Sequence, residues 1–244
     1  MKVVGTVIMI CWSFLSLAAL VEEKIFIVPD SLETSQGEKF PYITYNSIRS
    51  FDQKNVRLEV AVGDQLDLWI VNLDSLDHRF DIKGFNLNLD IPAGDSINYI
   101  NTFNSAGSFI FYDAVDFPRY SYLGLSGMLI VKDHSHQSFY WNIKDHNMEW
   151  NSQLFQNNDA VWSDYDPKFF TVNGNSNPNI NLDADARITG NVGDTLYIYM
   201  TNTGKSIHPM HFHGYHVTIM ESSKFPSHVG WSKDSHGIYP METV

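Results

Sequence analysis

The stretch VGDTLYIYMTN at residues 192–202 repeats the pattern of VGDQLDLWIVN at residues 62–72, at an offset of 130 residues (192 minus 62). In both, a Gly-Asp turn signal precedes alternating apolar residues, which is typical of a strand entered from a tight turn. Residues further along keep the same offset: His78 and His208, Phe80 and Met210, Gly84 and Gly214. Chance similarity of two strands would not extend so far, so the sequence predicts two copies of one β domain.

Short runs rich in β-branched and aromatic residues alternate with turn signals along most of the chain, which predicts an all-β fold. The predicted strands are residues 24–28, 57–62, 65–72, 96–102, 108–112, 125–131 and 139–143, with a strand and turn at 169–174. We expect 57–62 and 65–72 to form two strands around a tight turn, and 31–39 to be a polar connection. One short helix is expected at 146–156.

The first residues have the features of an export signal. Lys2 precedes a nearly unbroken apolar run over residues 3–21 that ends in small residues. Cleavage after Ala18 or Ala19 fits this pattern, so we assign residues 1–20 to a signal peptide. We therefore expect an exported protein, secreted or periplasmic. The alternative is an uncleaved membrane anchor, because the run is long enough to span a bilayer.

Two features of the composition exclude classes of partner and site. The 16 Lys and Arg against 28 Asp and Glu give a net charge of -12, which makes nucleic acid and anionic membrane surfaces poor partners. The only cysteine, Cys11, lies in the predicted signal peptide. A cleaved protein could therefore form no disulfide and no thiolate-ligated metal site.

Residues 208–217, HPMHFHGYHV, contain four of the ten histidines. Side chains alternate along a strand, so His211 and His213 are expected to point to one face and to bind one ion. His208, beside Pro209, is expected to reach in from the preceding turn. Neutral imidazole suits copper, zinc, iron and nickel. We therefore predict these three histidines as metal ligands; the alternative is a surface strand that happens to carry histidines.

The remaining histidines are not predicted to bind metal. In the first copy, Asp81 and Lys83 stand where the second has His211 and His213, so the first copy has lost the site. His78 is then expected to be hydrogen-bonded or structural. We expect His134 and His136 to lie in a solvated polar linker. The side chain of His216 is expected to face away from the metal, and His228 and His236 are expected to lie in a solvent-facing loop.

The second copy is predicted to be shorter than the first. Residues 91–96, IPAGDS, resemble residues 239–244, YPMETV, where the sequence ends. The first copy continues for another 35 residues, from Ser96 to Val131 (131 minus 96), with its last two or three strands. A β domain without those strands would expose unpaired sheet edges. We expect either a truncated or incompletely predicted sequence, or strands supplied by another chain.

Together these segments resemble the multicopper oxidase family, which is built from cupredoxin domains. The resemblance covers most of the chain after the signal peptide and is carried by FFTVNG (169–174), VGDTLYIYMTN (192–202), HPMHFHGYH (208–216), VGDQLDLWIVN (62–72) and YLGLSGMLIV (122–131). It implies two tandem Greek-key cupredoxin-like β-sandwich domains, residues 21–133 and residues 134–244, the second incomplete. It also implies copper as the cofactor.

The resemblance further implies roles for the motif histidines. In the family, the first histidine of such a motif binds the blue copper and the next two bind the trinuclear cluster that reduces oxygen. This would give His208 the first role, and His211 and His213 the second. The closing segment of the first copy, residues 111–128, has a methionine but neither cysteine nor histidine. Alone, the chain supports at most one mononuclear site.

Three functions stay open at this stage. The leading hypothesis is an exported copper-binding protein with one-electron redox chemistry at a His-ligated copper, acting on a small molecule or a metal ion. The second is a non-catalytic module for copper holding or protein contacts. The third is a hydrolytic zinc site with Glu221 as general base. Catalytic residues, the substrate and the oligomeric state stay unassigned.

Overall fold

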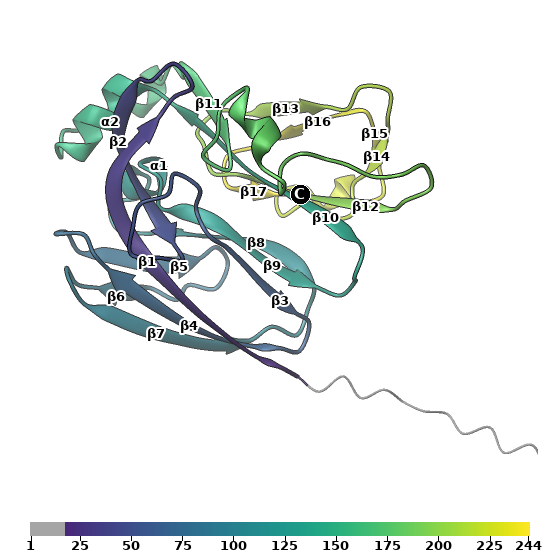
Figure 1. The fold of residues 1–244 in the computed structure, drawn as a ribbon, viewed down its shortest axis with the longest axis horizontal. Helices are drawn as coiled ribbons and strands as arrows, with labels where there is room; N and C mark the ends of the chain where they lie inside the picture. The colour runs from purple at the N-terminus through teal and green to yellow at the C-terminus, as the bar shows by residue number, and fades with distance from the viewer. Residues whose placement is uncertain (1–17) are drawn as a thin grey trace, which may run out of the picture.

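The computed structural model describes residues 18–244, whose regular secondary structure is mostly β-strand with a few short helices (Figure 1). The predicted all-β class with two tandem sandwich-like halves is therefore confirmed. Most of the predicted signal peptide, including Cys11, lies outside the described residues. No helix within residues 18–244 combines the length and the apolar character needed to cross a membrane.

The first half is a sandwich of two sheets. One has the strand order β2-β1-β4-β7 and the other β3-β9-β8-β5-β6. The strands are β1 (Leu20–Glu33), β2 (Lys39–Asn46), β3 (Arg57–Ala61), β4 (Gln65–Asn72), β5 (His78–Ile82), β6 (Leu89–Ile91), β7 (Ser96–Thr102), β8 (Gly107–Asp113) and β9 (Ser126–Lys132), with a short helix α1 (Arg119–Tyr122) before β9.

Alternation along β4 shows how this sandwich forms. Leu66, Leu68 and Ile70 are fully buried, whereas Asp67 and Trp69 between them point outward. The buried side chains pack against residues of both sheets in one apolar cluster. Removing each such side chain from water contributes about 1.5–3 kcal/mol, so the period-two pattern in the sequence selects the face that becomes the core.

One sequence prediction about this half needs correction. Residues 31–39 are not simply a connection, because β1 runs on to Glu33 and β2 begins at Lys39. The two strands predicted around the tight turn at Gly63 are β3 and β4, but they do not pair with each other. Instead β3 pairs with β9 in one sheet, and β4 pairs with β1 and β7 in the other.

The second half begins with β10 (Gln137–His146), which runs parallel to β12 (Leu196–Asn202) as β1 runs parallel to β4. A four-stranded sheet has the order β11-β10-β12-β17, and two-stranded sheets join β13 to β16 and β14 to β15. The other elements are α2 (Met148–Phe155), β11 (Phe169–Val172), β13 (His208–His211), β14 (Val217–Thr218), β15 (Ser232–Lys233), β16 (Ser235–Ile238), β17 (Glu242–Thr243) and the 3-10 turns η1 (Trp162–Asp164), η2 (Asn179–Leu182) and η3 (Pro226–His228). The helix predicted at 146–156 is α2.

One asparagine in each half makes the same set of hydrogen bonds. The Asn72 side-chain amide donates to the carbonyls of Leu76 (2.7 Å) and Ile91 (3.0 Å). Asn202 donates likewise to Ser206 (2.7 Å) and Ile238 (2.9 Å). Each amide ties the end of a central strand to the loop that follows it and to the next edge strand.

The register corrects the sequence match near the end of the chain. His78 pairs with Ile91, and His208 pairs with Ile238, so the structural counterpart of Ile91 is Ile238 rather than the predicted Tyr239. The offset there is 147 (238 minus 91). It exceeds the earlier offset of 130 by 17 residues, which accommodate the β14-β15 hairpin and η3.

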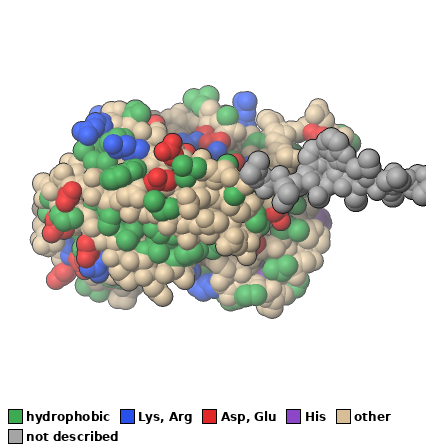
Figure 2. Space-filling model, turned by 90° about the horizontal axis from the view of Figure 1, so that it is seen from below, with side chains coloured by type: hydrophobic (Ala, Val, Ile, Leu, Met, Phe, Trp, Pro, Cys, Tyr) green, Lys and Arg blue, Asp and Glu red, His purple; other side chains and the backbone are tan. Residues whose placement is uncertain are grey.

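The two halves pack against each other through polar contacts. The Lys54 ammonium bonds to Asp183 (2.8 Å) and Asp185 (2.7 Å). The buried ammonium of Lys144 donates to the Ser121 carbonyl (2.6 Å). Figure 1 shows the green and yellow second half alongside the purple and blue first half. On the face shown in Figure 2, acidic and basic side chains are interspersed rather than gathered into one charged patch.

Candidate metal centre

Strand β13 carries His208 and His211 on opposite faces. The two residues are three positions apart, and side chains alternate along a strand, so one points inward and the other outward. His208 is buried, with 8% of its surface exposed, and His211 is exposed. The motif therefore presents its first histidine to the core and its second to the surface.

His208 is held by a carboxylate from β10. Its Nε2 lies 3.1 Å from Oδ1 of Asp145, which is fully buried. The same carboxylate accepts hydrogen bonds from the backbone N–H of Lys205 (2.8 Å) and from the Ser206 hydroxyl (3.1 Å). Burial alone would raise the pKa of Asp145, but the hydrogen bonds from His208 and from these groups lower it well below its usual range.

His211 and His213 form an adjacent pair. Their ring centroids are 4.8 Å apart and their planes are inclined by 70°. The strand ends at His211, so His213 is not on the strand as predicted but opens the turn at Gly214, which has a φ of 77°. Both imidazoles are exposed, and the turn still brings them together.

The orientation of the His211 ring is fixed by the neighbouring strand. Its Nδ1 lies 2.8 Å from the Ser235 hydroxyl and 3.2 Å from the Asp234 carbonyl oxygen. A carbonyl can only accept, so a proton on Nδ1 satisfies it and leaves the lone pair on Nε2. Thus His211 and His213 are brought together while His208 lies apart, and residues 18–244 contain no cluster of three or more potential metal-binding side chains.

The corresponding positions in the first half have structural contacts. The Asp81 carboxylate accepts from the backbone N–H of Ile82 (2.7 Å) and Leu87 (2.9 Å). The Lys83 ammonium donates to the backbone carbonyl of Met241 in the second half. Neither position offers an imidazole.

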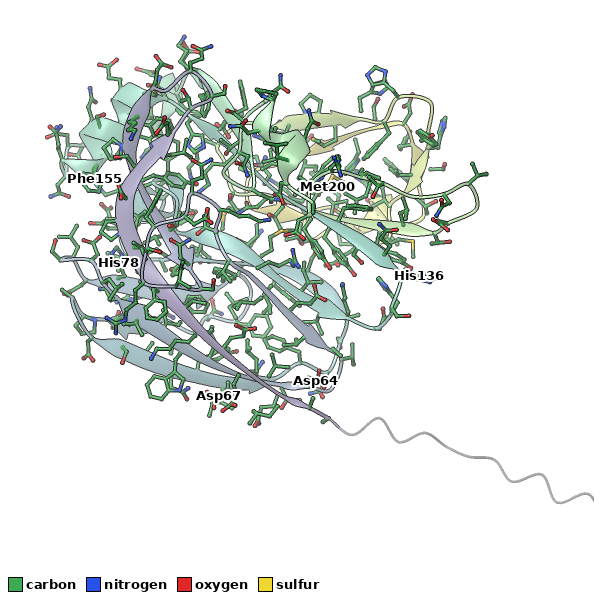
Figure 3. All side chains as sticks on the ribbon, viewed as in Figure 1. Asp64, Asp67, His78, His136, Phe155 and Met200 are labelled. Atoms are coloured by element: carbon green, nitrogen blue, oxygen red, sulfur yellow. The ribbon has the colours of Figure 1, made fainter. Side chains whose placement is uncertain are left out.

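His78 is a buried, hydrogen-bonded histidine, which confirms the structural role predicted for it. Its Nδ1 lies 2.5 Å from Asp113 and its Nε2 lies 3.1 Å from Asp74. Although burial opposes the charged form, the two carboxylates raise the pKa of His78 to about 9. In Figure 3 this residue lies within the first half, away from the second half that contains the motif.

Two predictions about the other histidines need correction. His134 is not merely solvated: its ring stacks on Tyr197 at a centroid distance of 3.8 Å, and its Nε2 lies 3.0 Å from the Tyr199 hydroxyl. His228 and His236 do not simply face solvent, because each has one buried ring nitrogen. His216 is exposed.

A cavity of about 690 Å³ opens beside β12 and the segment that follows the motif. Its lining includes Tyr199, Met200, Phe212, His216 and Glu221. Glu221 is the general base that the zinc hypothesis requires. Its carboxylate instead accepts from the backbone N–H of Ser108 in the first half (3.0 Å), and burial raises its pKa. This contact joins the two halves rather than serving the histidine pair.

Sequence reasoning missed Asp145. It lies 63 residues before His208 on a different strand, in the unremarkable sequence Lys-Asp-His. Nothing in local spacing links the two residues. Only the parallel pairing of β10 with β12 brings the carboxylate beneath the turn that precedes the motif.

Residues 141–244 match the family model described as multicopper oxidase. The predicted resemblance to multicopper oxidases is confirmed for this part of the chain. The multicopper oxidase match contains all three motif histidines and Asp145. A comparison with curated proteins gave no match.

Solved structures of copper proteins share the fold over almost the whole chain. The blue copper oxidase of Nitrosomonas europaea is 18% identical, with a TM-score of 0.75, and the match covers 92% of this chain and 74% of that one. The copper nitrite reductase of the same organism is 18% identical (TM-score 0.69; 92% and 82% covered). The multicopper oxidase of Campylobacter jejuni, a metallo-oxidase, is 15% identical (TM-score 0.66; 92% and 49% covered).

Proposed function

We propose that this chain is an exported copper-binding protein related to multicopper oxidases, and that His211 and His213 bind the copper. The observation that carries this proposal is the adjacent, exposed pair of imidazoles, 4.8 Å apart, with the Nδ1 of His211 anchored to β16 and the preceding residue. Export rests on the apolar N-terminal segment, which precedes the described residues.

The donor chemistry of the pair fits copper. Imidazole nitrogens bind copper well, and copper binds such sites more tightly than the other divalent first-row metals. A hydrogen bond to the ring nitrogen that does not bind metal orients the ligand and raises its basicity, which is what Asp234 and Ser235 supply to His211. Bound copper would supply one-electron oxidation and reduction, and the exposure of both rings leaves room for further ligands.

His208 stays in the proposal as a ligand at a separate position. Asp145 engages its Nε2, so Nδ1 is the nitrogen that remains for a metal. The separation of the inward His208 from the outward pair agrees with the family pattern, in which the first histidine binds a different copper from the next two. We infer that the two halves are copies of one cupredoxin unit, supported by the matched bonds of Asn72 and Asn202.

The second candidate function is a non-catalytic role, which is favoured by the loss of the histidine pair in the first half. Asp81 and Lys83 occupy the positions of the histidine pair and are committed to structural hydrogen bonds. Domains of this fold can keep their architecture after losing a metal site. Stoichiometric copper binding without turnover of phenols, metal ions or nitrite would favour this role over the redox enzyme.

Copper titration tests the proposal. We expect the purified protein to bind copper(II) at His211 and His213, and the double variant His211→Ala/His213→Ala to weaken that binding at least 100-fold, about 2.7 kcal/mol. His216→Ala is the matched control, since it removes an exposed imidazole from the same segment. Its affinity should equal that of the unmodified protein. Equal copper affinity in the double variant and the control, with both folded, would refute the proposed ligands.

A further inference from the structure

The imidazoles of His228, at the end of η3, and His236, in β16, lie close together. Their ring centroids are 5.6 Å apart, and the planes are nearly perpendicular at 85°. His228 Nδ1 and His236 Nε2 are both buried and have no hydrogen-bond partner among the described residues. A buried polar atom without a partner costs about 1–3 kcal/mol, so two of them on neighbouring rings call for a physical explanation.

The surroundings hold the His228 ring in place. Phe225 stacks on it at 4.9 Å and Trp231 at 4.1 Å, with interplanar angles of 18° and 24°. These two stacking contacts restrict the orientation of the His228 ring, whose Nδ1 is buried.

His236 is set by the pairing of β16 with β13. Its cross-strand partner is Met210, so the imidazole and the thioether lie side by side on the inward face. The next pair along, His211 and Ser235, points to the opposite, outward face. Burial lowers the pKa of His236, which keeps its ring neutral and its lone pair available.

We propose that His228 and His236 form a second metal site, distinct from the outward pair, that binds copper(I), with the Met210 thioether as a neighbouring soft donor. Two rings that share one ion through nitrogens at about 2.0 Å place their centroids roughly 5–6 Å apart, and the observed 5.6 Å lies in that range.

The charge balance favours a monovalent ion. The solvation cost of a buried ion rises with the square of its charge, so a divalent ion in this aromatic pocket would need anionic ligands. The carboxylate that acts on His236 is Glu242, which is fully buried. Its oxygens already accept from the Ser222 hydroxyl (2.6 Å) and the Tyr239 backbone N–H (2.8 Å). One nearby anion that does not ligate the metal balances one positive charge, and thioether donors select copper(I).

An anaerobic copper(I) titration against a chromogenic chelator tests this site. The parent protein carries His211→Ala/His213→Ala, so that the outward pair cannot contribute. We expect the parent to bind one equivalent of copper(I) and to quench the fluorescence of Trp231, which stacks on His228. His228→Phe keeps the aromatic stack but removes the nitrogen, and it should lower the affinity at least 30-fold. Met210→Leu should lower it about 3-fold, as expected for a weak neighbouring donor.

The controls separate a metal site from a structural cluster. Trp231→Phe should keep the affinity and lose the quenching. His236→Gln serves as a second nitrogen deletion if His228→Phe does not fold. An unchanged copper(I) affinity in the folded His228→Phe or His236→Gln protein would overturn the proposal. So would a parent protein that binds no copper(I) while His228→Phe only raises the melting temperature.

Discussion

We expect Asp145→Ala to lower the free energy of unfolding by about 3–5 kcal/mol, because it removes one partner of a buried charged cluster. The carboxylate accepts from the His208 ring, from two backbone N–H groups and from the Ser206 hydroxyl, and all of these would lose their acceptor at once. Urea denaturation at pH 7 measures the change. A loss below about 1 kcal/mol would show that the cluster does not hold the turn before the motif.

A second substitution perturbs the same cluster without touching its charge. A methyl group at Gly204 would overlap the Asp145 carboxylate, whereas one at Gly237 would meet Ile207 at an ordinary 3.5 Å. Gly204→Ala should therefore lower the free energy of unfolding by about 1–3 kcal/mol, and Gly237→Ala should lower it much less.

The Asp145 cluster should also make stability depend on pH. The pKa of Asp145 is lowered in the folded protein, so its contribution to stability is present above the unfolded pKa, near pH 4, and is lost as the pH falls below that value.

The second large effect is expected for His78→Gln, which should lower the free energy of unfolding by an amount that depends on pH. With both ring nitrogens facing carboxylates, the folded protein keeps His78 protonated up to a pKa of about 9, against about 6.5 unfolded. The raised pKa makes its contribution fully present below pH 6.5 and lost as the pH rises through 9. A shift of that size corresponds to on the order of 3 kcal/mol. We expect His78→Gln to lose this contribution.

The measurement is the difference in unfolding free energy between the unmodified protein and His78→Gln at pH 6.5, 8 and 9.5. The difference is needed because burial also lowers the pKa values of Lys144 (to about 7) and Lys205 (to about 8). Those two groups make stability rise with pH over the same window, which opposes the His78 effect. A difference that stays constant across the three pH values would contradict the charged state assigned to His78.

Strand positions were largely predictable, because alternation and turn chemistry are local. The strand at 96–102 is β7 residue for residue, and Asn147 caps the expected helix through its side chain, which accepts from the N–H groups of Glu149 and Trp150. Partner choice was less predictable. β3 and β4 share a turn but lie in different sheets, where their partners come from distant parts of the chain: β9 for β3, and β1 and β7 for β4.

The site was predictable as a motif but not as an arrangement. Spacing in the sequence singled out His208, His211 and His213 as candidate ligands, but it did not show that His208 points inward, away from the other two. The buried acceptor Asp145 and the inward pair His228 and His236 depend on contacts between segments far apart in the chain or within an inserted loop. Periodicity does not report such contacts, which is why the loop was expected to face solvent.

Pulsed electron paramagnetic resonance of the copper(II)-loaded protein tests the central claim most directly, because it counts the imidazole nitrogens coupled to the metal. At one equivalent of copper(II), which fills the exposed pair first, we predict two coupled imidazoles in the unmodified protein, one in each of His211→Ala and His213→Ala, and still two in His208→Ala, whose ring lies at a separate position beside Asp145. A count that does not change in His211→Ala and His213→Ala would contradict the assignment of copper to this pair.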